Sequence, residues 1–231
     1  MKLFFGEINS NAVILDEDEQ QHILKVLRMK SGAQLYITDG KGNLAEGTLR
    51  IEGKKTNVEV AKIQFYENKF IPKLHIAIAP TKNIDRIDFF VEKATEMGIS
   101  EISFLLTEKS ERKNINIDKI RKKVVAASKQ SLRYHFPMVN EMQKLSSFLE
   151  QIDTENTFVA HCDKAFERAD IKTIGKVPAL TFLVGPEGDF SPNEIKILSQ
   201  RGIKAVSLGS QRLRTETAGV FLAAWNYYQM I

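Results

Sequence analysis

Two hydrophobic patterns divide the chain near residue 70. Residues 34–38, 44–51 and 57–65 alternate apolar with polar side chains and are separated by Asp-Gly and Glu-Gly turns, which predicts short strands joined by hairpins. In the third run the apolar positions slip by one residue between Val60 and Ile63, as a β-bulge would require. Residues 12–30 begin acidic and continue as an amphipathic helix. We therefore predict a small β-rich domain with one helix.

Beyond Ile71-Pro72 the alternation of apolar and polar residues gives way to continuous apolar runs and helical spacing. Short apolar runs, which predict buried strands, cover residues 74–79, 102–106, 158–160, 180–184 and 205–208. Helical spacing of apolar residues separates several of these runs, over residues 84–98, 118–132 and 215–228. This alternation predicts an α/β fold with a mostly parallel sheet and helices on both faces. We expect two domains, residues 1–70 and 71–231.

Two glycine-anchored loops in the last fifty residues each follow a predicted strand and precede a predicted helix. The first loop leads into Ser191-Pro192-Asn193-Glu194, a capping box with proline at the first helical position, and its helix is expected to end at Gly202. Ligands of open α/β sheets bind outside the carboxyl ends of strands. One such loop alone would be an ordinary connection between a strand and a helix. Two in tandem favour a ligand site, formed mostly by backbone groups of Leu183, Val184, Gly185, Pro186, Glu187, Gly188, Leu208, Gly209, Arg212, Leu213, Arg214 and Thr215.

The common phosphate-binding motifs are missing from the sequence. It contains no Gly-x-x-x-x-Gly-Lys-Ser/Thr and no Gly-x-Gly-x-x-Gly after a strand, which excludes a P-loop and a dinucleotide fingerprint. The glycine-rich stretch 39–43 lies between two strand-like runs, so we interpret it as a hairpin turn.

Positive charge is concentrated in one segment. The chain has a net charge of +4, yet residues 1–70 hold ten basic and ten acidic residues. Residues 109–133 hold nine basic residues and two acidic ones. Such a segment is typical of a phosphate-binding stripe, and equally of a solvated helix face.

The remaining composition narrows the class of protein. A single cysteine, Cys162, excludes an internal disulfide and fits a reducing compartment. The four histidines are scattered, so we expect no metal site, and we interpret His161-Cys162 as a strand end. The longest apolar run, residues 218–225, is too short to span a membrane, and the N-terminus lacks a signal peptide, so we expect a cytoplasmic protein. The helix that contains this run is apolar nearly all round, which predicts burial in the core on one side and a homodimer interface on the other.

Several motifs together resemble one known family. They are Val184-Gly-Pro-Glu-Gly-Asp-Phe-Ser191, Leu208-Gly209, Arg212-Leu-Arg-Thr-Glu-Thr-Ala218, Glu92-Lys-Ala-Thr-Glu-Met-Gly98, Glu111-Arg112, Ala126-Ala-Ser-Lys-Gln-Ser-Leu-Arg133 and His22-Ile-Leu-Lys-Val-Leu-Arg28. In this order they are similar to the ribosomal RNA small subunit methyltransferase E family, a branch of the SPOUT (α/β-knot) methyltransferases. One departure is Asp189, where the family pattern has a second glycine. Asp is a short polar residue that tolerates a positive φ.

The resemblance implies a fold and an activity. Residues 1–70 would be a PUA-like RNA-binding barrel, and residues 71–231 a SPOUT domain with a trefoil knot that acts as a homodimer. The activity would be transfer of a methyl group from S-adenosylmethionine to N3 of a uridine in small-subunit ribosomal RNA, free or in the assembled subunit. Expected RNA contacts are His22, Arg28, Arg86, Arg112, Lys113, Arg121, Lys122, Lys123 and Arg133. Two alternatives are a transfer RNA ribose 2′-O-methyltransferase of the same superfamily and a non-catalytic RNA-binding assembly factor.

Methylation at N3 of uracil requires removal of a proton and stabilisation of the resulting anion. Arg214 and Glu216, in the second glycine loop and the start of its helix, are the candidates for these two roles. Glu216 could instead serve only as a first-turn carboxylate that complements the helix dipole. Glu187 is a third candidate carboxylate.

Overall fold

The computed structural model describes residues 2–9, 12–53, 55–163 and 167–230. The chain divides into two compact units, Met1–Lys69 with Val125–Phe136, and Phe70–Val124 with Pro137–Ile231. Residues 125–136, the second half of a helix and the turn after it, thus pack with the N-terminal unit, although they lie far from it in the sequence.

The N-terminal unit is built around a four-stranded sheet of order β1-β4-β5-β6. Its elements are β1 (Leu3–Phe5), β2 (Glu7–Asn9), β3 (Ala12–Ile14), α1 (Glu17–Gln21), the π-helical turn η1 (His22–Val26), β4 (Gln34–Thr38), β5 (Asn43–Glu52) and β6 (Lys55–Phe65). The three predicted strands are confirmed, and so is the hairpin turn predicted at residues 39–43, which in the structure spans 39–42. The bulge is confirmed as well, because Glu46 pairs with Lys62 while Gly47 pairs with Val60.

The predicted helix over residues 12–30 is wrong at both ends. Ala12–Ile14 pairs antiparallel with Glu7–Asn9, and the helix starts only after Asp16, whose side chain accepts a hydrogen bond from the backbone N–H of Glu19. At its other end the helix widens into the π-helical turn and stops before Arg28, which has a positive φ of 50°. The apolar spacing therefore identified the buried face, with Ile23 fully buried, and overestimated the length.

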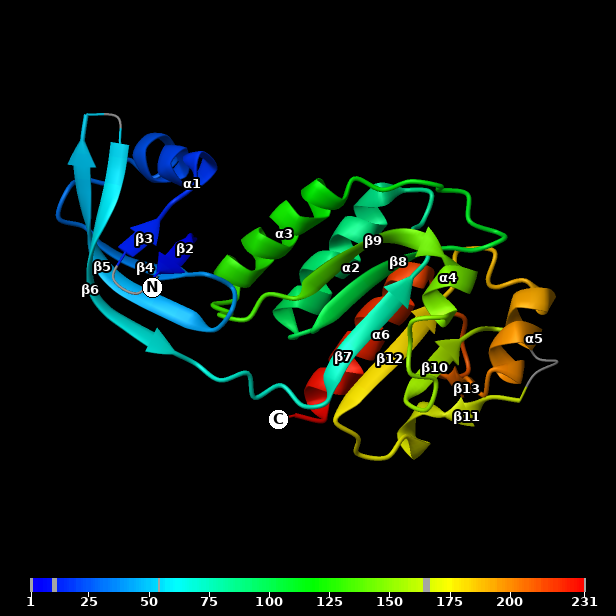
Figure 1. Cartoon of the computed structure of the whole chain (residues 1–231). Helices are drawn as coiled ribbons and strands as arrows, with labels where there is room; N and C mark the ends of the chain where they lie inside the picture. Colours follow the sequence, from blue (N-terminus) through cyan, green and yellow to red (C-terminus); the bar gives the residue numbers. More distant parts are fainter. Residues whose placement is uncertain (1, 10–11, 54, 164–166, 231) are drawn as a thin grey trace. The chain divides into compact units, whose positions relative to one another are not determined.

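The second unit contains a seven-stranded sheet of order β11-β13-β10-β12-β7-β8-β9 (Figure 1). Its elements are β7 (Lys73–Ile78), α2 (Ile84–Glu96), β8 (Glu101–Leu106), α3 (Ile117–Gln130), β9 (Met138–Lys144), α4 (Leu145–Leu149), β10 (Thr157–Ala160), β11 (Ala169–Asp170), the 3-10 turn η2 (Ile171–Thr173), β12 (Ala179–Val184), α5 (Pro192–Gln200), β13 (Lys204–Ser207) and α6 (Thr215–Tyr228). All of its strand pairings are parallel, which confirms the predicted α/β class. Strands β9 and β11 were not predicted.

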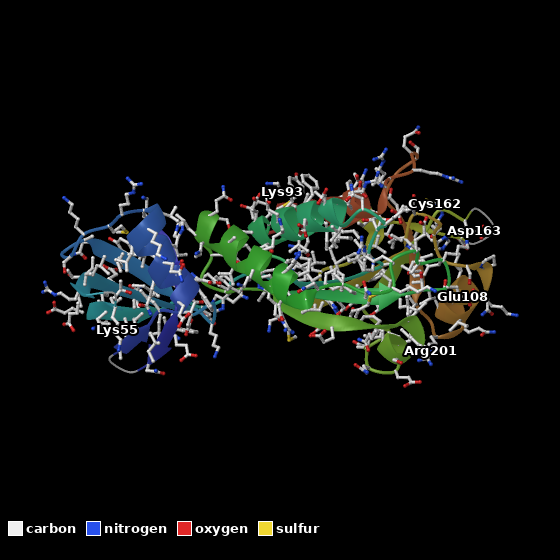
Figure 2. All side chains as sticks on the ribbon, turned by 90° about the horizontal axis from the view of Figure 1, so that it is seen from above. Lys55, Lys93, Glu108, Cys162, Asp163 and Arg201 are labelled. Atoms are coloured by element: carbon white, nitrogen blue, oxygen red, sulfur yellow. The ribbon has the colours of Figure 1, made fainter. Side chains whose placement is uncertain are left out.

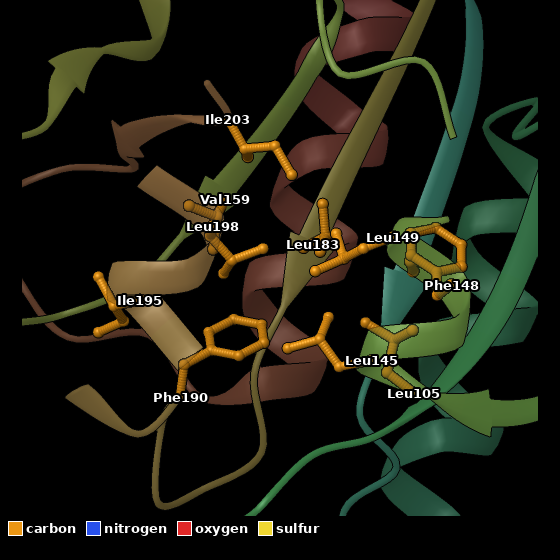
Figure 3. Packing of buried hydrophobic residues seen from close by; sticks show 11 residues of the cluster. Leu105, Leu145, Phe148, Leu149, Val159, Leu183, Phe190, Ile195, Leu198 and Ile203 are labelled. Carbon is orange, nitrogen blue, oxygen red and sulfur yellow. The ribbon is translucent and has the colours of Figure 1, made fainter. Parts of the chain in front are cut away.

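The parallel sheet is covered on both faces. On one face, Ala77, Leu105 and Leu183 pack against α4 and α5 in the cluster drawn in Figure 3. On the other, α6 contacts α2, β7 and β12. Gly219 of α6 allows this close approach, since a Cβ there would lie 2.6 Å from the ring of Phe90 in α2. The two glycine loops are thereby attached to a rigid sheet.

No helix within the described residues is both long enough and apolar enough to cross a membrane.

Candidate functional site

A cavity of about 750 Å³ opens at the carboxyl ends of β10, β12 and β13. This volume lies within the range of small-molecule and cofactor sites. The three strands are neighbours in the parallel sheet, so the segments that leave them meet at one edge. The two glycine loops form most of the wall.

The sequence-predicted ligand residues are brought together here. Eleven of the twelve line the cavity: Val184, Gly185, Pro186, Glu187, Gly188, Leu208, Gly209, Arg212, Leu213, Arg214 and Thr215. The twelfth, Leu183, is fully buried and belongs to the core cluster behind the site. One hydrogen bond joins the two loops, from Thr215 Oγ1 to the carbonyl oxygen of Gly185 at 2.9 Å. The start of α6 is thus fixed to the first loop.

The first loop is held in shape by its own polar side chains. Asp189 adopts a positive φ of 60°, which confirms that it can replace the expected glycine. Its carboxylate accepts hydrogen bonds from the backbone N–H groups of Phe190, at 2.8 Å, and Cys162, at 2.7 Å. The predicted capping box of Ser191 and Glu194 is confirmed. These bonds connect the loop to α5 and to the segment after β10.

That segment supplies a third wall that sequence reasoning missed. His161, Cys162 and Asp163 follow β10 directly and line the cavity together with Arg168 (Figure 2 labels Cys162 and Asp163). Arg168 donates a hydrogen bond to the carbonyl oxygen of His161. Burial lowers the pKa of His161, against the opposing effect of Asp189, so this imidazole favours its neutral form. The predicted strand at residues 158–160 could have indicated this wall. It corresponds to β10, which lies between β12 and β13, the two strands that carry the glycine loops.

An arginine and two carboxylates meet beside the cavity. Arg86, in the first turn of α2, lies 3.9 Å from Glu187 and 3.8 Å from Glu216. Both distances exceed hydrogen-bonding range. Arg86 and Glu187 line the cavity, whereas Glu216 does not and is only 8% exposed. Oε2 of Glu216 is buried and has no hydrogen-bond partner among the described residues.

The predicted RNA-binding residues do not form one group. Arg86 lies in the cavity wall, and Arg112 donates to the carbonyl oxygens of Thr81 and Lys82, which ties two loops together. In and beside α3, Lys113 and Lys122 are exposed, and Arg133 is half-buried. Arg121 pairs with Asp118 and Glu141, and Lys123 pairs with Asp88. His22 and Arg28 belong to the N-terminal unit, at the π-helical turn and just after it. The positive segment is therefore partly neutralised by its own neighbours.

The described part of the chain holds no cluster of three or more His, Cys, Asp or Glu side chains that could bind a metal ion.

Comparisons with known proteins match both units. The family model "RNA methyltransferase domain" matches residues 67–226, and "RNA methyltransferase PUA domain" matches residues 15–60. Ribosomal RNA small subunit methyltransferase E from Aquifex aeolicus is 29% identical over 233 residues, which cover 97% of this chain and 98% of that protein.

Two solved structures extend the match over the whole fold. A probable rRNA-methyltransferase from Porphyromonas gingivalis is 32% identical, with a TM-score of 0.91 over 100% of this chain and 98% of that one. A putative methyltransferase from Legionella pneumophila, in complex with the bound cofactor SAM, is 26% identical, with a TM-score of 0.87 over 99% of this chain and 96% of that one.

The Asp189 carboxylate should contribute measurably to stability. We expect Asp189→Ala to lower the free energy of unfolding by about 2–4 kcal/mol. The variant loses two partly buried hydrogen bonds to a charged acceptor, and alanine must adopt a positive φ. Asp189→Asn keeps a short polar side chain that tolerates this φ and should cost less. Urea denaturation of both variants checks this, and equal unfolding midpoints for Ala, Asn and the parent protein would refute it.

Proposed function

Since the chain belongs to the RNA methyltransferase family, and within it to the ribosomal RNA small subunit methyltransferase E enzymes, we propose that it methylates N3 of a specific uridine in small-subunit ribosomal RNA. The observation that carries this proposal is the cavity between the two glycine loops, at the carboxyl ends of parallel strands. Its place of action is then the compartment that holds the ribosomal subunit or its precursor RNA, the cytoplasm.

The cofactor is S-adenosylmethionine, which the Legionella relative holds. The residues present here fit it. The wall is formed largely by the two loops, with Gly185, Gly188 and Gly209 among its members, and at these glycines no side chain keeps a ligand from the backbone N–H and carbonyl groups. When bound, the cofactor supplies an electrophilic methyl group on a sulfonium, for which the protein needs only to position the acceptor.

The acceptor determines what the side chains must do. N3 of uracil carries a proton, so the base becomes a nucleophile only as that proton leaves and negative charge spreads to its two carbonyl oxygens. We infer that Arg214, exposed at the cavity wall as the N-cap of α6, stabilises this charge. Arg86 lies on the same wall and adds a second cation.

For the proton we propose Glu216. It is buried, it lies beside Arg86, and one of its oxygens has no hydrogen-bond partner among the described residues, so it retains a free acceptor site. Glu187 lines the cavity more directly, but one of its oxygens already accepts a hydrogen bond from the backbone N–H of Lys82 at 3.0 Å. The two carboxylates are therefore distinguishable by substitution.

RNA is proposed to contact the remaining predicted basic residues through its phosphates. Lys113 is exposed and is the strongest candidate, whereas Arg121 and Lys123 already pair with acidic side chains. Arg112 has a structural task in its bonds to Thr81 and Lys82.

We further propose that two copies associate through α2 and α6. These helices pack together and still expose large apolar side chains: Phe89 at 51%, Phe221 at 37% and Tyr228 at 75%. Aromatic residues are enriched at interfaces because they combine apolar area with rigid shape. Arg86, which lines the cavity, belongs to α2, so we propose that a partner on this face completes each site.

The direct test of the proposed reaction is the modification itself. Small-subunit ribosomal RNA from cells with and without the protein is digested and analysed by mass spectrometry, and purified protein is then used to restore the missing group. We expect one N3-methyluridine to depend on the protein. A methyl group found instead on a ribose oxygen of transfer RNA, or no change in any RNA, would overturn the proposal.

Gly209 offers a test of the cofactor site. Its φ is +132°, a conformation that valine does not adopt without strain, so Gly209→Val should displace the second loop and weaken S-adenosylmethionine binding at least 100-fold, or about 3 kcal/mol. Gly175→Val is the matched control, because an added Cβ there meets nothing. Calorimetric titration measures both. Unchanged affinity in Gly209→Val would place the cofactor elsewhere.

Glu216 and Glu187 can be ranked by kinetics. We expect Glu216→Gln to lower kcat by about 10² to 10⁴, the usual contribution of a general base, with little effect on cofactor affinity. Glu187→Gln should reduce the rate less. Single-turnover methylation over a range of pH measures both, and the opposite ranking would assign the proton to Glu187.

The proposed dimer predicts a sedimenting species of twice the monomer mass of 26.2 kDa at low micromolar concentration. Phe89→Glu should shift it toward monomer, because charge on an apolar interface is costly to bury, whereas Ile14→Glu on the other unit should not. A monomer with full activity would exclude the dimer.

A further inference from the structure

Four aromatic side chains of the N-terminal unit gather from two distant segments. Phe65 is the last residue of strand β6 and Tyr66 follows it, while Tyr134 and His135 lie after α3. The rings of Tyr66 and Tyr134 lie 4.7 Å apart, and those of Phe65 and His135 lie 6.2 Å apart and nearly perpendicular. We call this group the aromatic platform.

The β4–β5 hairpin turn holds the platform in place. Gly42 donates to the carbonyl oxygen of Tyr134 and accepts from the N–H of Tyr66, so one turn residue bridges the two segments. Gly40 accepts from the N–H of Phe136. Both glycines have positive φ, and a Cβ would lie 2.7 Å from the Phe136 ring at position 40 and 2.6 Å from the His135 ring at position 42. The glycine-rich turn of the sequence thus serves to seat the segment 134–136.

Two further features fix the rings. His135 Nε2 donates to the carbonyl oxygen of Tyr66 at 2.6 Å, so the imidazole is held against the neighbouring segment. In the turn after α3, Leu132 has a positive φ of 56°, and the N–H of Arg133 bonds back to the carbonyl oxygen of Ser128. A left-handed leucine costs about 1–2 kcal/mol. The chain therefore accepts local strain to direct residues 133–136 onto the hairpin.

The platform is only partly covered. Phe65 is 62% exposed, and Tyr66, Tyr134 and His135 are each partly exposed. None of the four belongs to the hydrophobic core of this unit, which forms around Phe4, Ile23 and Leu35 instead. Rigid, exposed aromatic rings that contribute little to a core are typical of a binding surface.

The chemistry of the surroundings favours RNA. Lys41 pairs with His135 across a backbone β-bridge, and Arg133 directly precedes Tyr134, so two basic residues are neighbours of platform residues along the chain or across the bridge. Burial, Tyr66 and the one carboxylate of Glu46 raise the pKa of the Tyr134 phenol. Aromatic faces next to cations are the elements with which proteins bind single-stranded nucleic acid.

We propose that the aromatic platform binds unpaired nucleobases of the RNA substrate by stacking, with Phe65 as the principal contact. The proposal rests on the proposed function only in that RNA is the substrate. Bases inside a duplex stack on one another and offer no free face, so the platform selects single-stranded RNA.

The test compares Phe65→Ala with Ile14→Ala, which removes a similarly exposed apolar side chain from the same unit. The probes are an oligouridylate and the duplex that it forms with oligoadenylate. A stacked base is worth about 1–3 kcal/mol, so Phe65→Ala should weaken binding of the single strand at least fivefold and leave duplex binding unchanged. Phe65→Trp should retain affinity, and Ile14→Ala should match the parent protein.

Salt dependence separates stacking from phosphate contact. Phe65→Ala should leave the slope of log affinity against log salt unchanged, whereas Lys41→Ala should reduce it by about 0.7. Equal affinity of Phe65→Ala and the parent protein for the single strand, or an equal loss on the duplex, would overturn the platform. A change in sedimentation of Phe65→Ala would overturn it too and make this surface an interface between copies.

The two proposals fail separately. If the parent protein methylates ribosomal RNA but Phe65→Ala binds and reacts normally, only the platform is wrong. If the parent protein methylates no RNA while Phe65→Ala still weakens oligouridylate binding, the platform stands and the proposed reaction is wrong.

Discussion

The parallel register of four neighbouring strands is the constraint on which the site depends. Ile78, Val184, Ala160 and Val206 lie in one row across β7, β12, β10 and β13. Each strand ends at or just after this row, so four chain segments leave the sheet at one edge. A slip of one residue in any of these strands would exchange the side chains that pack on its two covered faces, and it would also displace a loop by about 3.3 Å. Burial of the sheet on both faces thus fixes the geometry of the cavity.

Local signals predicted those parts of the structure that depend on local physics. The capping box at Ser191, the end of α5 near Gly202 and the whole of α6 follow from hydrogen bonds and periodicity within a few residues, and the structure confirms them. The two-loop site could also be predicted, because parallel strands place their carboxyl ends together. The helix over residues 12–30 was wrong because one N-cap, Asp16, determines where helical geometry can begin, and apolar spacing carries no information on that.

Contacts between distant segments could not be predicted. The pairing of Glu19 with Lys129, at 2.7 Å, spans 110 residues and attaches the end of α3 to the N-terminal unit. The Glu19 carboxylate also accepts a hydrogen bond from the backbone N–H of Phe5, so both oxygens of this buried group have partners. Counting charges in residues 109–133 treated Lys129 as part of a basic surface, yet its ammonium is committed to the interior of this unit. Local charge density therefore overestimates the charge that is free to meet RNA.

Glu216 poses the opposite problem, a buried carboxylate that the fold leaves incompletely satisfied. A buried polar atom without a partner costs about 1–3 kcal/mol, and an aliphatic side chain at this position would avoid that cost. Two features reduce it: the position in the first turn of α6, where the helix dipole favours negative charge, and Arg86 at 3.8 Å. Neither supplies a hydrogen bond to Oε2. Thr215, the residue before Glu216, anchors the start of α6 to the carbonyl oxygen of Gly185. Among the described residues, the fold therefore keeps a buried acceptor without a hydrogen-bond partner next to an arginine, at a cost in stability.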